Sequence, residues 1–131
     1  MTHAKGTFTV TSWQEDAYAD LGGGAKLTKA SMVFGYDGDL RAECASEALM
    51  CYAPDGTAVY TGLDRITGEL GGRSGSFVLV SRGRFAGGEA RTEFEVAEGS
   101  GTGELAGLRG RGTGVSTSEP PGTFVLDYEI G

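Results

Sequence analysis

Apolar and polar residues alternate with a period of two along most of this chain, and no stretch has the period of a helix. β-Branched and aromatic residues predominate in the alternating runs, and glycine clusters or Asp-Gly pairs separate them. This pattern predicts antiparallel strands joined by short turns. We expect eight strands, at about residues 6–13, 26–36, 39–52, 57–69, 75–85, 90–97, 102–115 and 122–130.

Two segments are less clear. Residues 14–24 contain an LGGG run, and we interpret them as a loop between the first two strands. Residues 42–52 contain the helix formers of CASEALM, so a helix is an alternative there. A strand is favoured because hairpin turns flank this segment on both sides.

Eight antiparallel strands in one domain of residues 1–131 predict an all-β fold, an eight-stranded β-barrel of the lipocalin-like up-and-down meander type. The interior of a barrel of this size is either filled by side chains or holds one small ligand. We expect a central cavity. Gly110, Gly112 and Gly114 alternate in one strand, which indicates strong coiling or close packing against neighbouring aromatic rings.

Composition and charge narrow the classes of function. The formal net charge of −7 makes nucleic acid an unlikely partner. No apolar run approaches the length of a membrane span, and the N-terminus lacks the pattern of a secretory signal, so we expect a cytoplasmic protein with no membrane partner. The 24 glycines are about 18 % of the 131 residues, against about 7 % in average proteins. They follow no three-residue period, which excludes collagen.

Most catalytic constellations are absent from the sequence. His3 is the only histidine and lies in a terminus expected to fray, so a histidine-based triad is excluded. Cys44 and Cys51 fall on opposite faces of one strand, too far apart to pair or to form a zinc site. The glycine-rich residues 72–76 and 99–107 do not precede helices, so neither is read as a nucleotide site. We expect no metal and no cofactor.

Carboxylates, tyrosines and one tryptophan remain as candidates for chemistry. Glu104 is the first catalytic candidate, because it shares a strand face with Ala106 and Leu108. If it points inward, burial raises its pKa and suits it to act as a general acid or base. An exposed or structurally paired Glu104 is the simpler interpretation. Tyr60 is the second catalytic candidate, orienting a substrate oxygen, although a core tyrosine is the simpler interpretation.

A second group of residues is expected to line the ligand cavity. Trp13 forms either a plug or a wall, Glu43 is inward or solvated, and Asp64 and Arg65 are neighbours of which at most one faces inward. The candidate ligand-binding residues are Trp13, Glu43, Tyr52, Phe77, Leu79, Phe94 and Tyr128.

Several motifs together resemble one protein family. They are YTGLDRITGELGGRSGSFVL at residues 60–79, EGSGTGELAGLRGRG at residues 98–112, and LDYEI near the end of the chain. The opening GTFTVTSW and the turn FGYDGDL fit as well. The sequence resembles the DUF3224 family of uncharacterised bacterial proteins over nearly its whole length. The resemblance implies an allene oxide cyclase-like barrel around a central cavity and no settled activity.

These observations leave an enzyme and a binding protein as the main hypotheses. The first is a cofactor-independent isomerase, cyclase or lyase that folds an apolar metabolite in its interior, with Glu104 handling protons. The alternative is a non-catalytic carrier or storage barrel for a hydrophobic small molecule. A completely filled barrel that acts through its surface is a third possibility. Outward apolar residues such as Val78 and Val80 also lead us to expect a homo-oligomer.

Overall fold

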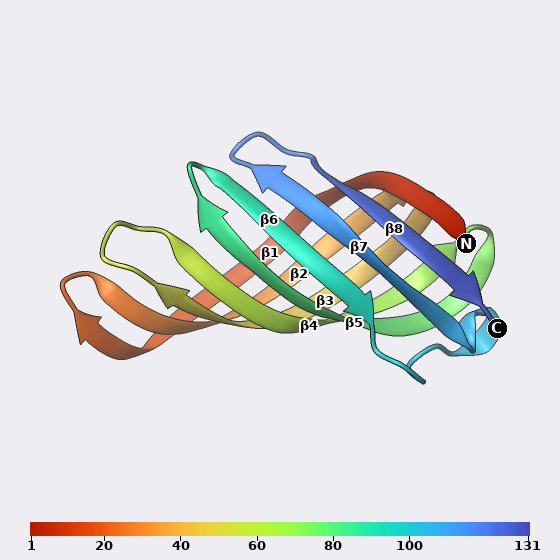
Figure 1. The fold of residues 1–131 in the computed structure, drawn as a ribbon, viewed down its shortest axis with the longest axis horizontal. Helices are drawn as coiled ribbons and strands as arrows, with labels where there is room; N and C mark the ends of the chain where they lie inside the picture. Colours follow the sequence, from red (N-terminus) through yellow and green to blue (C-terminus); the bar gives the residue numbers. More distant parts are fainter.

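The computed structural model describes residues 1–131 as eight antiparallel strands in one closed ring sheet (Figure 1). Each strand pairs with the next along the chain, and the last pairs with the first through Thr2 opposite Tyr128 and Phe8 opposite Gly122. The strands are β1 (Thr2–Gly22), β2 (Ala25–Gly38), β3 (Leu40–Tyr52), β4 (Ala58–Leu70), β5 (Arg73–Ala86), β6 (Glu89–Val96), β7 (Leu108–Thr117) and β8 (Gly122–Ile130).

The alternation predicted from the sequence is clearest in β3. Its inward side chains, such as Cys44, Ser46 and Ala48, are buried, while the residues between them are exposed. One face of each strand packs inside the ring and the other meets solvent, so residues of even spacing share one environment. The all-β prediction is confirmed, and residues 42–52 form a strand rather than a helix.

The two ends of the ring differ. A cluster of 14 buried residues fills the end that carries both termini, where Leu105, Leu108 and Leu126 are almost fully buried. The 3₁₀ turn η1 (Gly103–Leu105) lies at this end (Figure 1). At the opposite end the β1–β2 hairpin extends beyond the other strands (Figure 1). Packing is therefore continuous at one end of the ring only.

Three predicted features of the chain are corrected. Residues 14–24 are mostly strand, because β1 continues to Gly22 through register shifts after Val10 and Ala17. These shifts interrupt the period of two, which is why the sequence pattern was misleading there. The seventh strand begins at Leu108, not at residue 102. The N-terminus is paired rather than frayed, since Ala4 is buried and His3 contacts Asp127.

No helix in the chain combines the length and the apolar composition needed to cross a membrane.

Candidate functional site

A pocket of about 330 Å³ lies on the inner face of the ring, towards the end away from the termini. Twenty residues line it, 14 of them hydrophobic, and all eight strands contribute at least one. The lining includes four of the predicted site residues, Trp13, Tyr52, Tyr60 and Phe94. The fold therefore brings side chains from the whole length of the chain to one pocket.

Glycines on neighbouring strands make room for the aromatic walls of this pocket. A Cβ atom on Gly83 would lie 2.5 Å from the ring of Tyr60, and one on Gly122 would lie 2.5 Å from the ring of Phe8. Any larger residue would have to displace these rings. Phe8 in turn packs edge-on against Phe34, with ring centroids 6.1 Å apart. The high glycine content thus allows large rings inside a narrow sheet.

Asp64 is the one acidic side chain that lines the pocket. It is 6 % exposed, and Ser46 donates a hydrogen bond of 2.6 Å to its Oδ1 atom. Burial raises the pKa of Asp64, and the hydrogen bond from Ser46 opposes that rise only in part. A carboxyl group held in this way can exchange a proton closer to neutral pH than an exposed aspartate can.

The acidic groups around Asp64 are neutral at physiological pH. Burial raises the pKa of Tyr36, and the nearby Cys44 and Asp64 raise it further. The pKa of the Cys44 thiol is itself raised by burial and by Asp64, which makes it a poor nucleophile. Burial also raises the pKa of Tyr60, although its hydroxyl lies 2.7 Å from that of Thr92.

A second carboxylate, Glu15, organises the rim of the pocket. Its Oε2 atom accepts hydrogen bonds from Thr28 at 2.5 Å and from Tyr52 at 2.6 Å, and its Oε1 atom accepts one from Trp13 at 3.1 Å. Burial alone would raise the pKa of Glu15, but these donors and the nearby Lys26 together lower it. Glu15 is therefore ionised at neutral pH.

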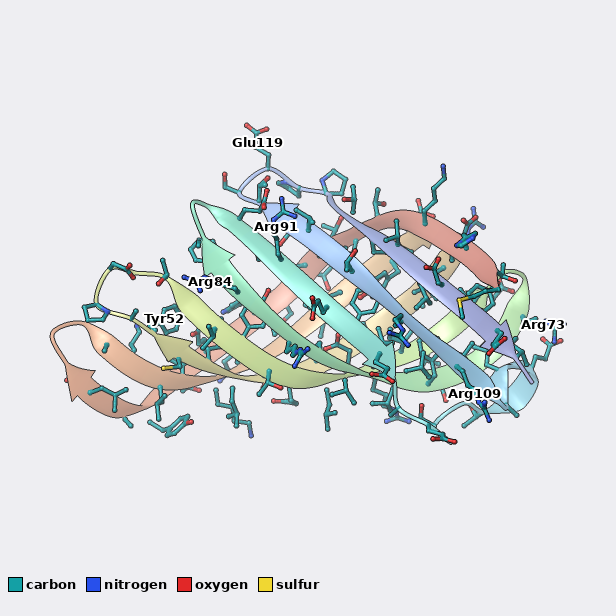
Figure 2. The ribbon with its side chains drawn as sticks, viewed as in Figure 1. Tyr52, Arg73, Arg84, Arg91, Arg109 and Glu119 are labelled. Carbon is teal, nitrogen blue, oxygen red and sulfur yellow. The ribbon has the colours of Figure 1, made fainter.

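Tyr52 joins this rim to the pocket, since it lines both the pocket and the shallow depression around Glu15. Figure 2 shows Tyr52 at the opposite end of the ring from Arg73 and Arg109. Burial and the bond to Glu15 raise the pKa of Tyr52 to about 12, so its hydroxyl remains a hydrogen-bond donor at physiological pH. Lys26 lies over its ring, 5.1 Å from the centroid.

The comparison with known families agrees with this architecture. A family model described as "Protein of unknown function (DUF3224)" matches residues 4–128. The chain belongs to the DUF3224 family. The crystal structure of a DUF3224 protein of unknown function from Shewanella oneidensis MR-1 is similar, with a TM-score of 0.79 and 27 % sequence identity. The similarity covers 100 % of this chain and 98 % of that one. No protein with a curated description matches the sequence.

Not all of the residues predicted for the site of this DUF3224 protein reach the pocket. Phe77, Leu79 and Tyr128 are buried, but they belong to the hydrophobic cluster at the end with the termini. Glu43 is exposed on the outer face of β3. Whether a residue reaches the pocket depends on its strand face and on how far along the strand it lies between the two ends of the ring. The sequence pattern does not indicate that distance.

Glu104 does not face the interior, and its expected position on a strand is wrong. It lies exposed in η1, where its Oε1 atom accepts a hydrogen bond of 2.9 Å from the backbone N–H of Ser74. Gly103 and Gly107 have positive φ values of +61° and +82°, and the turn they form ends any strand pattern through this segment.

Two neighbours of Glu104 act in the same way on β5. The hydroxyl of Thr102 accepts a bond of 3.0 Å from the N–H of Ser76, and the hydroxyl of Ser100 accepts one of 3.0 Å from the N–H of Val78. β6 pairs with β5 only from Leu79 onward, so these three side chains occupy a strand edge that would otherwise be open. The glycine-rich motif of the DUF3224 chain has a structural role here.

Sequence reasoning did not name Ser46 in the pocket or Glu15 at its rim, and it left open whether Asp64 or Arg65 faces inward. The sequence does contain a signal for Asp64, because it lies four residues after Tyr60 and so shares one face of β4 with it. The same alternation is compatible with the opposite face, which carries Arg65, turned inward. The register of β4 against its neighbours decides between the two faces: Asp64 is buried and Arg65 is exposed.

Proposed function

We propose that the ring sheet is a barrel of the allene oxide cyclase type and that its pocket holds one small, mainly apolar molecule. One observation carries the proposal: a pocket of about 330 Å³ is lined by 14 hydrophobic residues and a small group of polar ones. Ligand sites in proteins have volumes of about 300–1,000 Å³ and this balance of lining. A completely filled barrel that acts through its surface is less consistent with such a volume.

A cofactor-independent isomerase or cyclase is the second candidate function. The supporting observation is the buried Asp64 with its Ser46 partner, because a carboxyl group with a raised pKa inside an apolar pocket suits proton transfer. Tyr60 lines the same pocket and would orient a substrate oxygen. In this version of the function Asp64 takes the part first expected of Glu104, which lies outside the pocket.

Native mass spectrometry of the protein purified from its own host tests the pocket directly. We expect close to one bound small molecule per chain, released on denaturation. Ala48 lines the pocket, so Ala48→Phe should fill part of it and abolish the bound mass. Ala45 is exposed on the outer face of the same strand, so Ala45→Phe is the matched control and should retain the ligand.

The same experiment separates the two candidate functions. A carrier is isolated with its ligand, whereas an enzyme with transient substrates is isolated empty. If the wild-type protein is empty and no small molecule protects it from thermal unfolding, the proposal of a ligand site is wrong. Circular dichroism must show that Ala48→Phe still folds before its loss of ligand is interpreted.

A further inference from the structure

The pocket contains a buried acid and no basic side chain. Asp64 lies among its twenty lining residues, and none of the twenty is lysine, arginine or histidine. The only hydrogen bond to its carboxyl group comes from Ser46, through Oδ1. Its Oδ2 atom therefore has no hydrogen-bond donor from the protein. A buried carboxylate without a counter-ion is costly, because burial removes the water that would otherwise solvate the charge.

The titratable groups around Asp64 cannot supply a positive charge. Tyr36 on β2, Cys44 on β3 and Tyr60 on β4 are the titratable side chains that its charge influences, and all three are acids. Lys26 is a basic group at the rim, where it interacts with Glu15 and with the Tyr52 ring. Any positive partner for Asp64 would therefore come from outside the chain.

The walls of the pocket also suit a cation. Nine of the twenty lining residues are phenylalanine, tyrosine or tryptophan, among them Phe34, Tyr36 and Tyr60. The faces of aromatic rings carry partial negative charge and attract an ammonium group within about 6 Å of the ring centroid. An aromatic enclosure with one carboxyl group at its base therefore favours cations over anions. An anionic ligand would meet Asp64 without any compensating charge.

The charge of the whole chain has the same sign. The chain carries a net charge of −7, although at the rim the ionised Glu15 lies beside Lys26. A negative surface raises the local concentration of cations and repels anions. The net charge of the chain, the rings along the walls and the acid at the base all discriminate in the same direction.

We propose that the ligand of this pocket is an organic cation, an amine carried on a compact apolar body, whose ammonium group binds Asp64. This inference rests on the proposed function, since it assigns a ligand class to that same pocket. The ammonium group would donate a charge-assisted hydrogen bond to Oδ2, and the apolar body would pack against the aromatic walls.

Three probes with one apolar body and different head groups test the inference. They are adamantylmethylamine, adamantylmethanol and adamantanecarboxylate, titrated into the wild-type protein at neutral pH by isothermal calorimetry. We expect the amine to bind about tenfold or more tightly than the alcohol, because a hydrogen bond to a charged group is stronger than a neutral one. The carboxylate should bind weakest of the three.

Two variants connect the preference to Asp64. Asp64→Asn should lower the affinity for the amine to that for the alcohol and leave the affinity for the alcohol within about twofold of wild type. Glu43→Gln removes an exposed carboxylate from the outer face and should change neither affinity. The ranking of the probes on the wild-type protein stands even if one variant fails to fold.

The outcomes distinguish this inference from the proposed function. If the alcohol or the carboxylate binds as tightly as the amine, and Ala48→Phe abolishes that binding, the pocket is a ligand site and the amine assignment is wrong. If an amine preference persists in Asp64→Asn, the assignment to Asp64 is wrong. If none of the probes binds and the protein from its own host is empty, the proposed function and this inference both fail.

Discussion

Asp64 makes the stability of the folded protein depend on pH. Burial raises its folded-state pKa above the ordinary value of 3.8, so the folded protein holds this proton more tightly than the unfolded chain does. The stabilising contribution of the group is complete below its unfolded pKa and is lost as the pH rises through the folded-state pKa. We therefore expect Asp64→Asn to be more stable than wild type at neutral pH and to lose this advantage in acid.

Urea unfolding of both proteins at about pH 7 and about pH 4 measures this difference. Other titrating groups, including Glu15 with its lowered pKa, are common to both proteins and cancel in the comparison. Glu43→Gln provides the exposed control and should follow wild type at both pH values. A stability difference between Asp64→Asn and wild type that does not change with pH would contradict the raised pKa.

Candidate site residues were easier to name from the sequence than the strand face they occupy. Tyr52, Tyr60 and Phe94 were named as candidates and line the pocket, but the sequence did not decide which face of β3 and β4 looks inward. Glu104, for which an inward and an exposed position were both considered, is exposed, because the turn at Gly103 removes it from any strand. A period of two is informative only where the backbone is extended, and the sequence does not show where a glycine-rich segment stops being extended.

At the scale of elements, residues 97–105 protect the open edge of β5. Thr102 is central, since its hydroxyl accepts a hydrogen bond from the N–H of Ser76 and lies 2.6 Å from the hydroxyl of Ser76. Replacing it by the similarly shaped valine should lower the free energy of unfolding by about 1 kcal/mol. Hydrogen exchange at the Ser76 amide should also become faster, because that N–H loses its acceptor.

Thr123→Val is the matched control for this experiment. Thr123 is exposed on β8, and its hydroxyl makes no hydrogen bond to the protein, so the substitution should change the stability by less than about 0.5 kcal/mol. Equal effects of the two substitutions would mean that the hydroxyl of Thr102 does not stabilise the edge. Ligand binding should be unchanged in both variants, because neither residue lines the pocket.

Turns between elements were easier to predict than the ends of strands. Asp37-Gly38 and the turn at residues 53–57 lie where the sequence placed them, since Asp-Gly pairs favour tight turns. The length of β1 was not predictable. Its register shifts move the inward positions by one residue, so the segment after Trp13 reads as polar and irregular although it remains paired with β2.

At the scale of the molecule, closure of the ring depends on pairs that no local pattern encodes. Thr2 pairs with Tyr128, 126 positions away in the sequence, and this closure brings Phe8 of β1 and Phe124 of β8 to the same pocket. Assembly into a homo-oligomer stays a prediction. Leu63 and Val80 are paired on the outer face and are 56 % and 46 % exposed, so sedimentation of the wild-type protein and of Leu63→Lys would test it.

The charge of the whole molecule leads to a last prediction, which depends on the amine inference. With a net charge of −7, the field around the molecule attracts cations. The Debye length increases from about 8 Å at 0.15 M salt to about 30 Å at 0.01 M, so this field extends further from the rim at low salt. The association rate of adamantylmethylamine should therefore rise by about tenfold over that change, while the rate for the uncharged alcohol stays constant.

Trp13 provides the signal for this measurement, because it is the only tryptophan in the chain and lines the pocket. Stopped-flow fluorescence with the two adamantyl probes gives both association rates under the same conditions. Equal salt dependence for the amine and the alcohol would show that the surface charge does not steer entry. Contacts formed after entry act on the dissociation rate. If the preference for the amine appears only in that rate, Asp64 and the aromatic walls discriminate between the probes, and the surrounding field does not.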